Sequence, residues 1–145
     1  MSSKANMGKW AEKQALLWLT EASNKSTDLA FHRLPDAHAA RGALAAQPAD
    51  LMVVKDGFFF LLEVKESAQT SRLPKAKVSQ WGSLKKFYWA GAGIIVLVFM
   101  SGINKWVTLG PIELGMGSET CPASFPLTNL PQYDSAAEAL EEYFK

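Results

Sequence analysis

The chain has 145 residues, of which 48% are hydrophobic and 20% are charged. This balance favours one globular domain with a sizeable core over a disordered chain. The single cysteine, Cys121, excludes an internal disulfide framework and a cysteine-rich zinc module. The polar N-terminus lacks the apolar core of a signal peptide, and the longest apolar run, Ala90–Met100, is too short to span a bilayer. We therefore expect a reducing, cytoplasmic setting.

The net charge of +1 says little, but the distribution of charge along the chain is informative. No Asp or Glu occurs from Ser67 to Ile112, whereas lysines and arginines recur throughout that stretch. A uniformly basic segment is suited to holding a polyanion. The alternative is a set of solvated lysines that only confer solubility, and for any single lysine this alternative is the stronger one.

The first elements in chain order are a helix and a strand. Good helix formers without an internal proline predict a helix over Met7–Ala22. Glu12 precedes Ala15, Leu16 and Leu19 by three, four and seven residues, so it is placed on the apolar face of this helix. A strand is predicted over Leu29–Leu34, closed by Pro35. The alanine-rich stretch Asp36–Gln47 fits either a helix or an excursion over the surface.

A β-hairpin is the strongest local prediction. Asp56-Gly57 favours a two-residue turn between strands Asp50–Lys55 and Phe58–Glu66. This turn pairs Lys55 with Phe58 and, further down the ladder, Asp50 with Glu63. Paired residues point to one face with Cβ atoms roughly 4.5–5.5 Å apart, and like charges placed there repel. A cation is therefore expected between the two carboxylates, with Lys65 on the same face because the strand period is two.

The second half of the chain predicts a helix and two strands. Pro74 fits the first turn of a helix that runs to about Trp89. Its apolar stripe comprises Val78, Trp81, Leu84 and Tyr88. The apolar run Ile94–Met100 is typical of a buried parallel strand, and Trp106–Leu109 is its expected antiparallel partner.

The C-terminal part is predicted to be mostly irregular. Gly, Pro and Ser without a period make Gly110–Gln132 a loop or an arm. Ser135 and Glu138 have capping-box spacing, which predicts a short acidic helix to Tyr143. The expected fold is a single α/β (α+β) domain of order αβββαββ, with a mixed central sheet flanked by helices. Residues 1–112 would form its core, and residues 113–145 an arm and short helix of the same domain.

This order and the residues of the hairpin resemble the PD-(D/E)XK nuclease superfamily, which implies a restriction-endonuclease-like core. The motif reads Pro48-Ala49-Asp50 followed by Glu63-Val64-Lys65, with Ala49 inserted between the proline and the aspartate of the family pattern. The likeness covers Lys9–Leu109. Within the superfamily the chain looks most similar to Holliday junction resolvases of RecU and bacteriophage type. The similar features are its small size, the helix that bears Glu12, and the Gln80-Trp81 pair that follows the strand with Lys65.

The resemblance implies a metal-dependent DNA endonuclease, and phosphodiester hydrolysis by such an enzyme uses hard divalent cations. We expect Asp50 and Glu63 to bind Mg²⁺, or Mn²⁺ in its place, with the Val64 carbonyl as third ligand. Lys65 is assigned to position or deprotonate the attacking water, or to offset phosphate charge. Its alternative is an edge-strand lysine that deters aggregation.

Two further residues are weaker candidates. Glu12 is assigned to a second metal, and its alternative is a first-turn glutamate favoured by the helix dipole. Gln80 is assigned to orient substrate or metal-bound water, and its alternative is a solvated helix residue. Both alternatives compete closely with the catalytic assignments.

DNA is the partner that the resemblance implies. Phosphate contacts position a substrate without reading sequence, so we expect recognition of DNA by its shape. The candidate phosphate-binding residues are Arg72, Lys75, Lys77, Lys85, Lys86, Arg33 and Arg41. The resemblance implies a homodimer that cuts a four-way junction symmetrically, in recombination, repair or phage DNA processing, and a host cytoplasm if the protein is phage-encoded. Alternatives are an exonuclease or restriction-like enzyme of the same fold, a catalytically idle DNA-binding module, and a hydrolase with another substrate.

Overall fold

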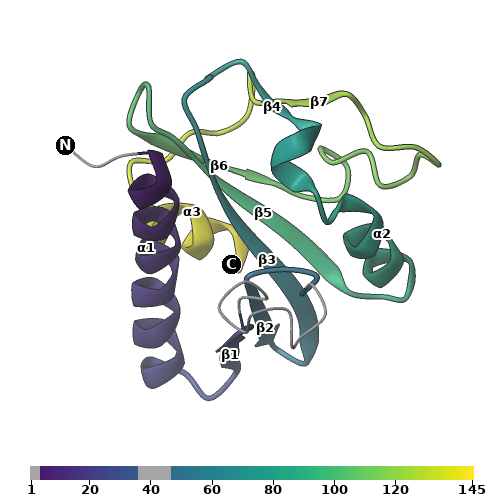
Figure 1. The fold of residues 1–145 in the computed structure, drawn as a ribbon. Helices are drawn as coiled ribbons and strands as arrows, with labels where there is room; N and C mark the ends of the chain where they lie inside the picture. Colours follow the sequence, from purple (N-terminus) through teal and green to yellow (C-terminus); the bar gives the residue numbers. More distant parts are fainter. Residues whose placement is uncertain (1–3, 36–46) are drawn as a thin grey trace.

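A five-stranded mixed sheet forms the centre of this computed structural model, which describes residues 4–35 and 47–145 (Figure 1). The strand order is β1-β2-β3-β5-β6, and a second sheet pairs β4 with β7. The elements are α1 (Lys4–Lys25), β1 (Leu29–Arg33), β2 (Leu51–Lys55), β3 (Phe58–Ser67), β4 (Arg72–Pro74), the 3₁₀ helix η1 (Lys75–Val78), α2 (Trp81–Trp89), β5 (Gly93–Met100), β6 (Lys105–Leu109), β7 (Ser124–Pro126) and α3 (Ala136–Tyr143).

The β2–β3 hairpin has the predicted register. Lys55 pairs with Phe58, and the ladder runs to Leu51 opposite Leu62. The turn residues Asp56 and Gly57 have φ values of 52° and 81°, the left-handed conformation that a two-residue turn of type I′ requires at both positions. One further step along this ladder places Asp50 beside Glu63.

The predicted parallel strand is also confirmed. β3 runs parallel to β5, with Glu63 beside Val96 and Lys65 beside Val98, and β6 pairs antiparallel with β5. Every residue of β5 from Ile94 to Met100 is buried, as expected for a strand covered on both faces.

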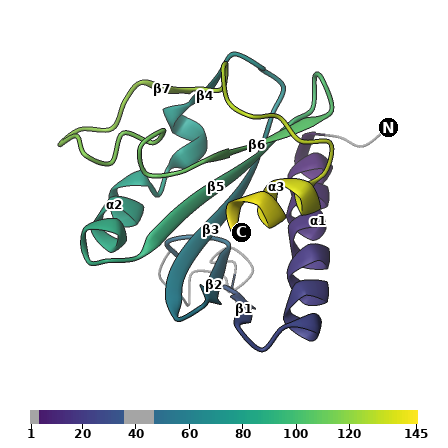
Figure 2. The same cartoon turned by 180° about the vertical axis from the view of Figure 1, so that it is seen from behind.

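Two apolar layers cover the sheet, one on each face. Figures 1 and 2 show α1 and α3 on one face and α2 on the other. Ala11, Ala15 and Leu19 form the buried stripe of α1, which extends beyond the predicted Met7–Ala22 at both ends. In the part of the chain that the structure describes, no helix is long and apolar enough to cross a membrane.

The prediction of one helix from Pro74 to Trp89 is wrong. Pro74 ends β4, a 3₁₀ turn follows, and the α-helix begins only at Trp81. The physical reason is a long-range contact: β4 pairs with β7, and the Lys75 N–H donates to the Ala123 carbonyl at 3.2 Å. These bonds hold the start of the segment extended. Tyr88, assigned to the apolar stripe, is 37% exposed.

The segment Gly110–Gln132 is more ordered than a loop. It contains β7, and Leu114, Met116, Phe125 and Leu127 are fully buried against the α2 face of the sheet. The Trp81 indole N–H donates to the Leu114 carbonyl at 2.8 Å. This segment is therefore part of the core.

The predicted C-terminal helix is confirmed, because the Ser135 hydroxyl accepts from the Glu138 N–H at 3.1 Å at the start of α3. The sequence leaves open whether residues 36–47 form a helix or an excursion over the surface. Residues 36–46, which include Arg41, lie outside the described residues.

Candidate active site

The base of the β2–β3 hairpin brings the predicted acidic residues together. The Val64 N–H donates to Asp50 Oδ2 at 2.8 Å, which ties Asp50 to the neighbouring strand. Lys65 Nζ lies 3.3 Å from Glu63 Oε1. The Glu63 side chain is only 7% exposed, whereas that of Lys65 is 27% exposed. The three residues thus meet where the hairpin enters the interior.

The electrostatics of this cluster favour binding of a cation. Burial and, after it, the charge of Asp50 raise the pKa of Glu63 to about 8, although Lys65 opposes the rise. Near neutral pH the Glu63 carboxyl group therefore keeps a proton unless another positive charge replaces it. A divalent cation at this position would remove the repulsion that raises the pKa.

A cavity of about 330 Å³ opens beside these residues, and we call it the carboxylate cavity. It is lined by Gly8, Lys9, Glu12, Asp50, Val64, Lys65, Glu66 and Lys77. Residues from α1, β3 and η1 therefore face one space, although they lie far apart in the sequence. This is room for a phosphate group and its hydration.

Glu12 lines the carboxylate cavity, as its placement on the inner face of α1 predicts. Its Oε1 accepts from Arg33 Nε at 2.9 Å, and its side chain is 19% exposed against 52% for Arg33. Arg33, a candidate for contacting DNA, thus contacts a candidate catalytic carboxylate. Because Arg33 is half exposed, this ion pair contributes little to stability.

The other candidates are dispersed. Gln80 precedes α2, where its carbonyl accepts from the Leu84 N–H at 2.9 Å, and it is not among the residues that line the cavity. Lys77 is. Lys85 lies over the Trp81 ring, 5.4 Å from its centroid. The remaining described candidates, Arg72, Lys75 and Lys86, are exposed and do not line the cavity.

Sequence reasoning missed three residues of the cavity wall, Gly8 and the charged residues Lys9 and Glu66. Glu66 is buried and its Oε2 accepts from Ser101 Oγ at 2.6 Å. Its position two residues after Val64 on the same strand was the available signal. Lys9 lies three residues before Glu12, which is the spacing of one helical turn.

The donor set fits a hard divalent cation. No group of three or more His, Cys, Asp or Glu residues within residues 4–35 and 47–145 is arranged to hold a metal. The site therefore offers the Asp50 and Glu63 carboxylates together with backbone carbonyl groups such as that of Val64. Mg²⁺ suits such a set, because it binds through one or two carboxylates and keeps several waters.

The comparisons with known proteins identify the fold. No protein-family model and no curated protein matches the chain. The structure is similar to that of Hjc, a Holliday junction resolvase from the archaeal hyperthermophile Archaeoglobus fulgidus. The TM-score is 0.53 and the sequence identity 19%, over 91% of this chain and 97% of that chain.

The likeness confirms the expected architecture, a small α+β domain with a restriction-endonuclease-like fold. A match over 91% of the chain also extends past Leu109, where the sequence resemblance ends. The narrower likeness to RecU and phage resolvases receives no specific support from this archaeal neighbour.

Proposed function

We propose that this protein is a divalent-cation-dependent DNA endonuclease that resolves four-way junctions. The observation that carries the proposal is the opposed pair of Asp50 and Glu63 with Lys65 beside it. Asp50 and Lys65 line the carboxylate cavity, and Glu63 is buried behind them. The fold supports the class of reaction, since the similar structure is described as a Holliday junction resolvase. The acid-free stretch from Ser67 to Ile112 supports DNA as the substrate.

Asp50 and Glu63 are the residues that would hold Mg²⁺, or Mn²⁺, with the Val64 carbonyl. A cation there supplies Lewis-acid stabilisation of the phosphate and lowers the pKa of a bound water. The Val64 N–H fixes the Asp50 carboxylate at 2.8 Å, so this ligand is held in place before substrate arrives. Burial of Glu63 excludes competing water from its side of the site.

Lys65 provides positive charge where the phosphate gains negative charge during hydrolysis. Its ammonium lies at 3.3 Å from Glu63 and reaches the cavity, so it is placed to contact both the carboxylate and a phosphate oxygen. Charge stabilisation of this kind is strongest in a partly desolvated site. Lys65 also orients the attacking water.

Glu12 and Gln80 have subordinate roles in this proposal. Glu12 lies on the cavity wall and would contact a second cation or its waters once Arg33 turns to the DNA backbone. Gln80 lies outside the cavity lining, so a role for it requires contact with a part of the DNA outside the cavity.

The basic residues of η1 and α2 would bind phosphates along the duplex arms. Such contacts give affinity that is independent of sequence, which suits recognition of DNA by its branched shape. Because a four-way junction offers two equivalent strands to cut, we propose a homodimer in which each subunit cuts one strand.

The decisive experiment incubates the protein with four-way junctions, flaps, linear duplexes and single strands in the presence of Mg²⁺ or Mn²⁺. Paired symmetric nicks near the crossover would support a resolvase. Degradation from free ends would indicate an exonuclease instead. Junction binding without cleavage of any substrate would reject catalysis and leave a DNA-binding module of the same fold.

A further inference from the structure

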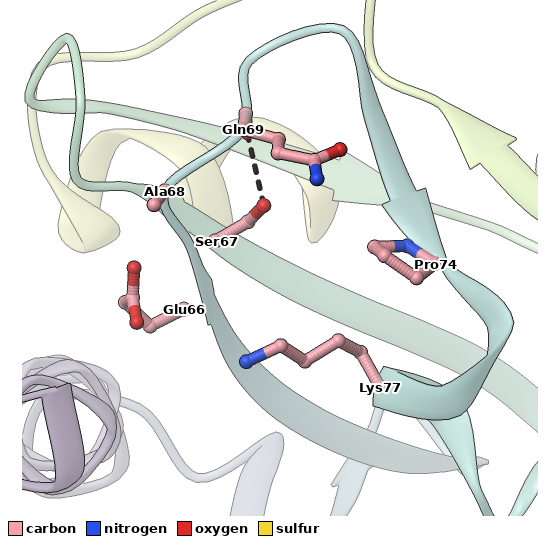
Figure 3. Close-up of a pocket in the computed structure, with 6 residues that line it drawn as sticks. All are labelled: Glu66, Ser67, Ala68, Gln69, Pro74 and Lys77. Atoms are coloured by element: carbon pink, nitrogen blue, oxygen red, sulfur yellow. Dashed lines mark hydrogen bonds between the residues drawn. The ribbon is translucent and has the colours of Figure 1, made fainter.

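A second, smaller cavity lies directly beside the carboxylate cavity. Its volume is about 130 Å³, and Figure 3 shows its six lining residues, Glu66, Ser67, Ala68, Gln69, Pro74 and Lys77. Two of these residues, Glu66 and Lys77, also line the carboxylate cavity. The two cavities are therefore neighbours along the end of β3.

The second cavity has fewer charged lining residues than the first. Among the described residues its only acidic lining residue is Glu66, whose carboxylate is held by Ser101 Oγ at 2.6 Å and points away from Gln69 and Pro74 in Figure 3. The Ser67 hydroxyl donates to the Gln69 carbonyl at 2.9 Å, which fixes the wall between them. The Gln69 amide and the Pro74 ring form an uncharged, partly apolar side of this cavity.

Lys77 stands between the two cavities. Figure 3 shows its side chain reaching from η1 toward β3. Within the described ranges its ammonium has no hydrogen-bond or ion-pair partner, unlike that of Lys65. A lysine that lines both cavities and has no partner among the described residues is suited to bind a phosphate.

The size of the second cavity limits its occupant. A cavity of roughly 150 Å³ binds benzene, and the second cavity, at about 130 Å³, is of similar size, so its occupant is limited to one six-membered ring. Proline offers an apolar face to such a ring, and the Gln69 amide offers both a donor and an acceptor. A pyrimidine base displaced from the stack meets these conditions, as in enzymes that bind extruded bases in side-chain pockets.

We propose that the strand to be cut passes through both cavities. The scissile phosphate lies in the carboxylate cavity, Lys77 binds the adjacent phosphate, and the second cavity receives the base of the adjoining nucleotide. Lys77 is in this view a positioning residue that sets which phosphate faces Asp50 and Glu63. The inference rests on the proposed nuclease function and adds to it the path of the substrate strand.

The test combines Lys77→Ala with junctions that carry one uncharged methylphosphonate at successive positions around the cut. Lys75→Ala is the comparison variant, because Lys75 is exposed on the same 3₁₀ turn and is assigned to a duplex arm but lines neither cavity. Any slowing that it causes should therefore multiply with that of the methylphosphonate next to the cut. Single-turnover cleavage should slow about tenfold to a hundredfold in Lys77→Ala, the loss expected for a hydrogen bond to a charged group. The methylphosphonate next to the cut should slow the wild type similarly and the variant no further, because the two changes remove one contact.

The second cavity is tested with Ala68→Phe, which fills it, and with an abasic nucleotide beside the cut. We expect Ala68→Phe to slow cleavage of the normal junction more than that of the abasic junction. Independent, multiplicative effects of Lys77→Ala at every methylphosphonate position, or equal slowing of both junctions by Ala68→Phe, would overturn this strand path. If instead the wild type cuts no DNA at all, the proposed nuclease function fails.

Discussion

Each end of the β2–β3 hairpin brings two carboxylates and a lysine together, but the carboxylates at the tip are exposed and Glu63 at the base is buried. At the tip, Lys55 Nζ lies 2.9 Å from carboxylate oxygens of both Asp28 and Asp56. At the base, Lys65 lies beside Glu63, which opposes Asp50. The Asp56 side chain is 59% exposed, whereas that of Glu63 is 7% exposed.

The pKa shifts at the two ends are opposite. At the tip, a hydrogen bond from the Ser26 hydroxyl, with others from Lys55 and Asp56, lowers the pKa of Asp28 well below its ordinary value. At the base, burial raises the pKa of Glu63 to about 8. Hydrogen bonds stabilise the ionised Asp28 at the tip, whereas exclusion of water destabilises the ionised form of Glu63 at the base. Burial, more than residue type, thus makes the base a candidate cation site and the tip a surface ion pair.

The largest predicted difference between the two ends is in catalysis. Asp50→Asn should lower DNA cleavage by about a thousandfold or more, because it removes a cation ligand that stabilises the transition state. Asp56→Asn makes the same chemical change at the tip and should leave the rate unchanged. Cleavage assays with Mg²⁺, alongside junction-binding assays, measure both. Equal losses in the two variants would contradict a functional distinction between the ends.

The second prediction concerns stability without a cation. The folded-state pKa of Glu63 is about 8 against an ordinary value of 4.5, so the folded protein binds more protons than the unfolded chain between these pH values. The free energy of unfolding should therefore fall as pH rises from about 4.5 to 8, by up to about 1.4 kcal/mol per pH unit. Urea unfolding in EDTA measures this slope.

Glu63→Gln is the control for the pH dependence. The amide cannot ionise, so the slope between these pH values should largely disappear in this variant. Asp50→Asn removes the neighbouring charge that also raises the pKa, so the fall in stability should begin at a lower pH. A wild-type slope that survives in Glu63→Gln would show that other groups cause it.

The smallest effect is expected at the tip. Lys55→Met should change the urea midpoint only slightly, because exposed ion pairs contribute little to stability. High salt should remove the difference, since it screens the pair in the wild type. Denaturation at two salt concentrations checks this, and a large loss of stability or of cleavage would show that the tip does more than join the strands.

The contrast also explains what the sequence could predict. The hairpin register follows from two local residues, Asp56 and Gly57, and it alone brings Asp50 to Glu63. The sequence predicts that Asp50 and Glu63 repel each other. It does not predict how deeply Glu63 is buried, because that depends on packing by elements distant in the sequence, and burial is the larger cause of the raised pKa.

Long-range contacts account for the wrong predictions. The pairing of Arg72 with Pro126 breaks the expected helix and orders the expected arm, and no local pattern encodes it. Lys77 was identified by its charge, but its place between two cavities depends on the short β4 strand and the turn that follows. Glu66 and Lys9 show strand and helix periodicity relative to known site residues, so a closer reading of spacing would have found them.

The most direct test of the account is calorimetric titration of Mg²⁺ or Mn²⁺ in buffers of different ionisation enthalpy at pH 7. If Asp50 and Glu63 hold a proton that a cation displaces, binding should release about one proton per site, and the release should vanish well above pH 8. Asp50→Asn should weaken binding sharply and Asp56→Asn should not. Cation binding without proton release, or with the same affinity in Asp50→Asn, would contradict the assignment of the hairpin base as the cation site.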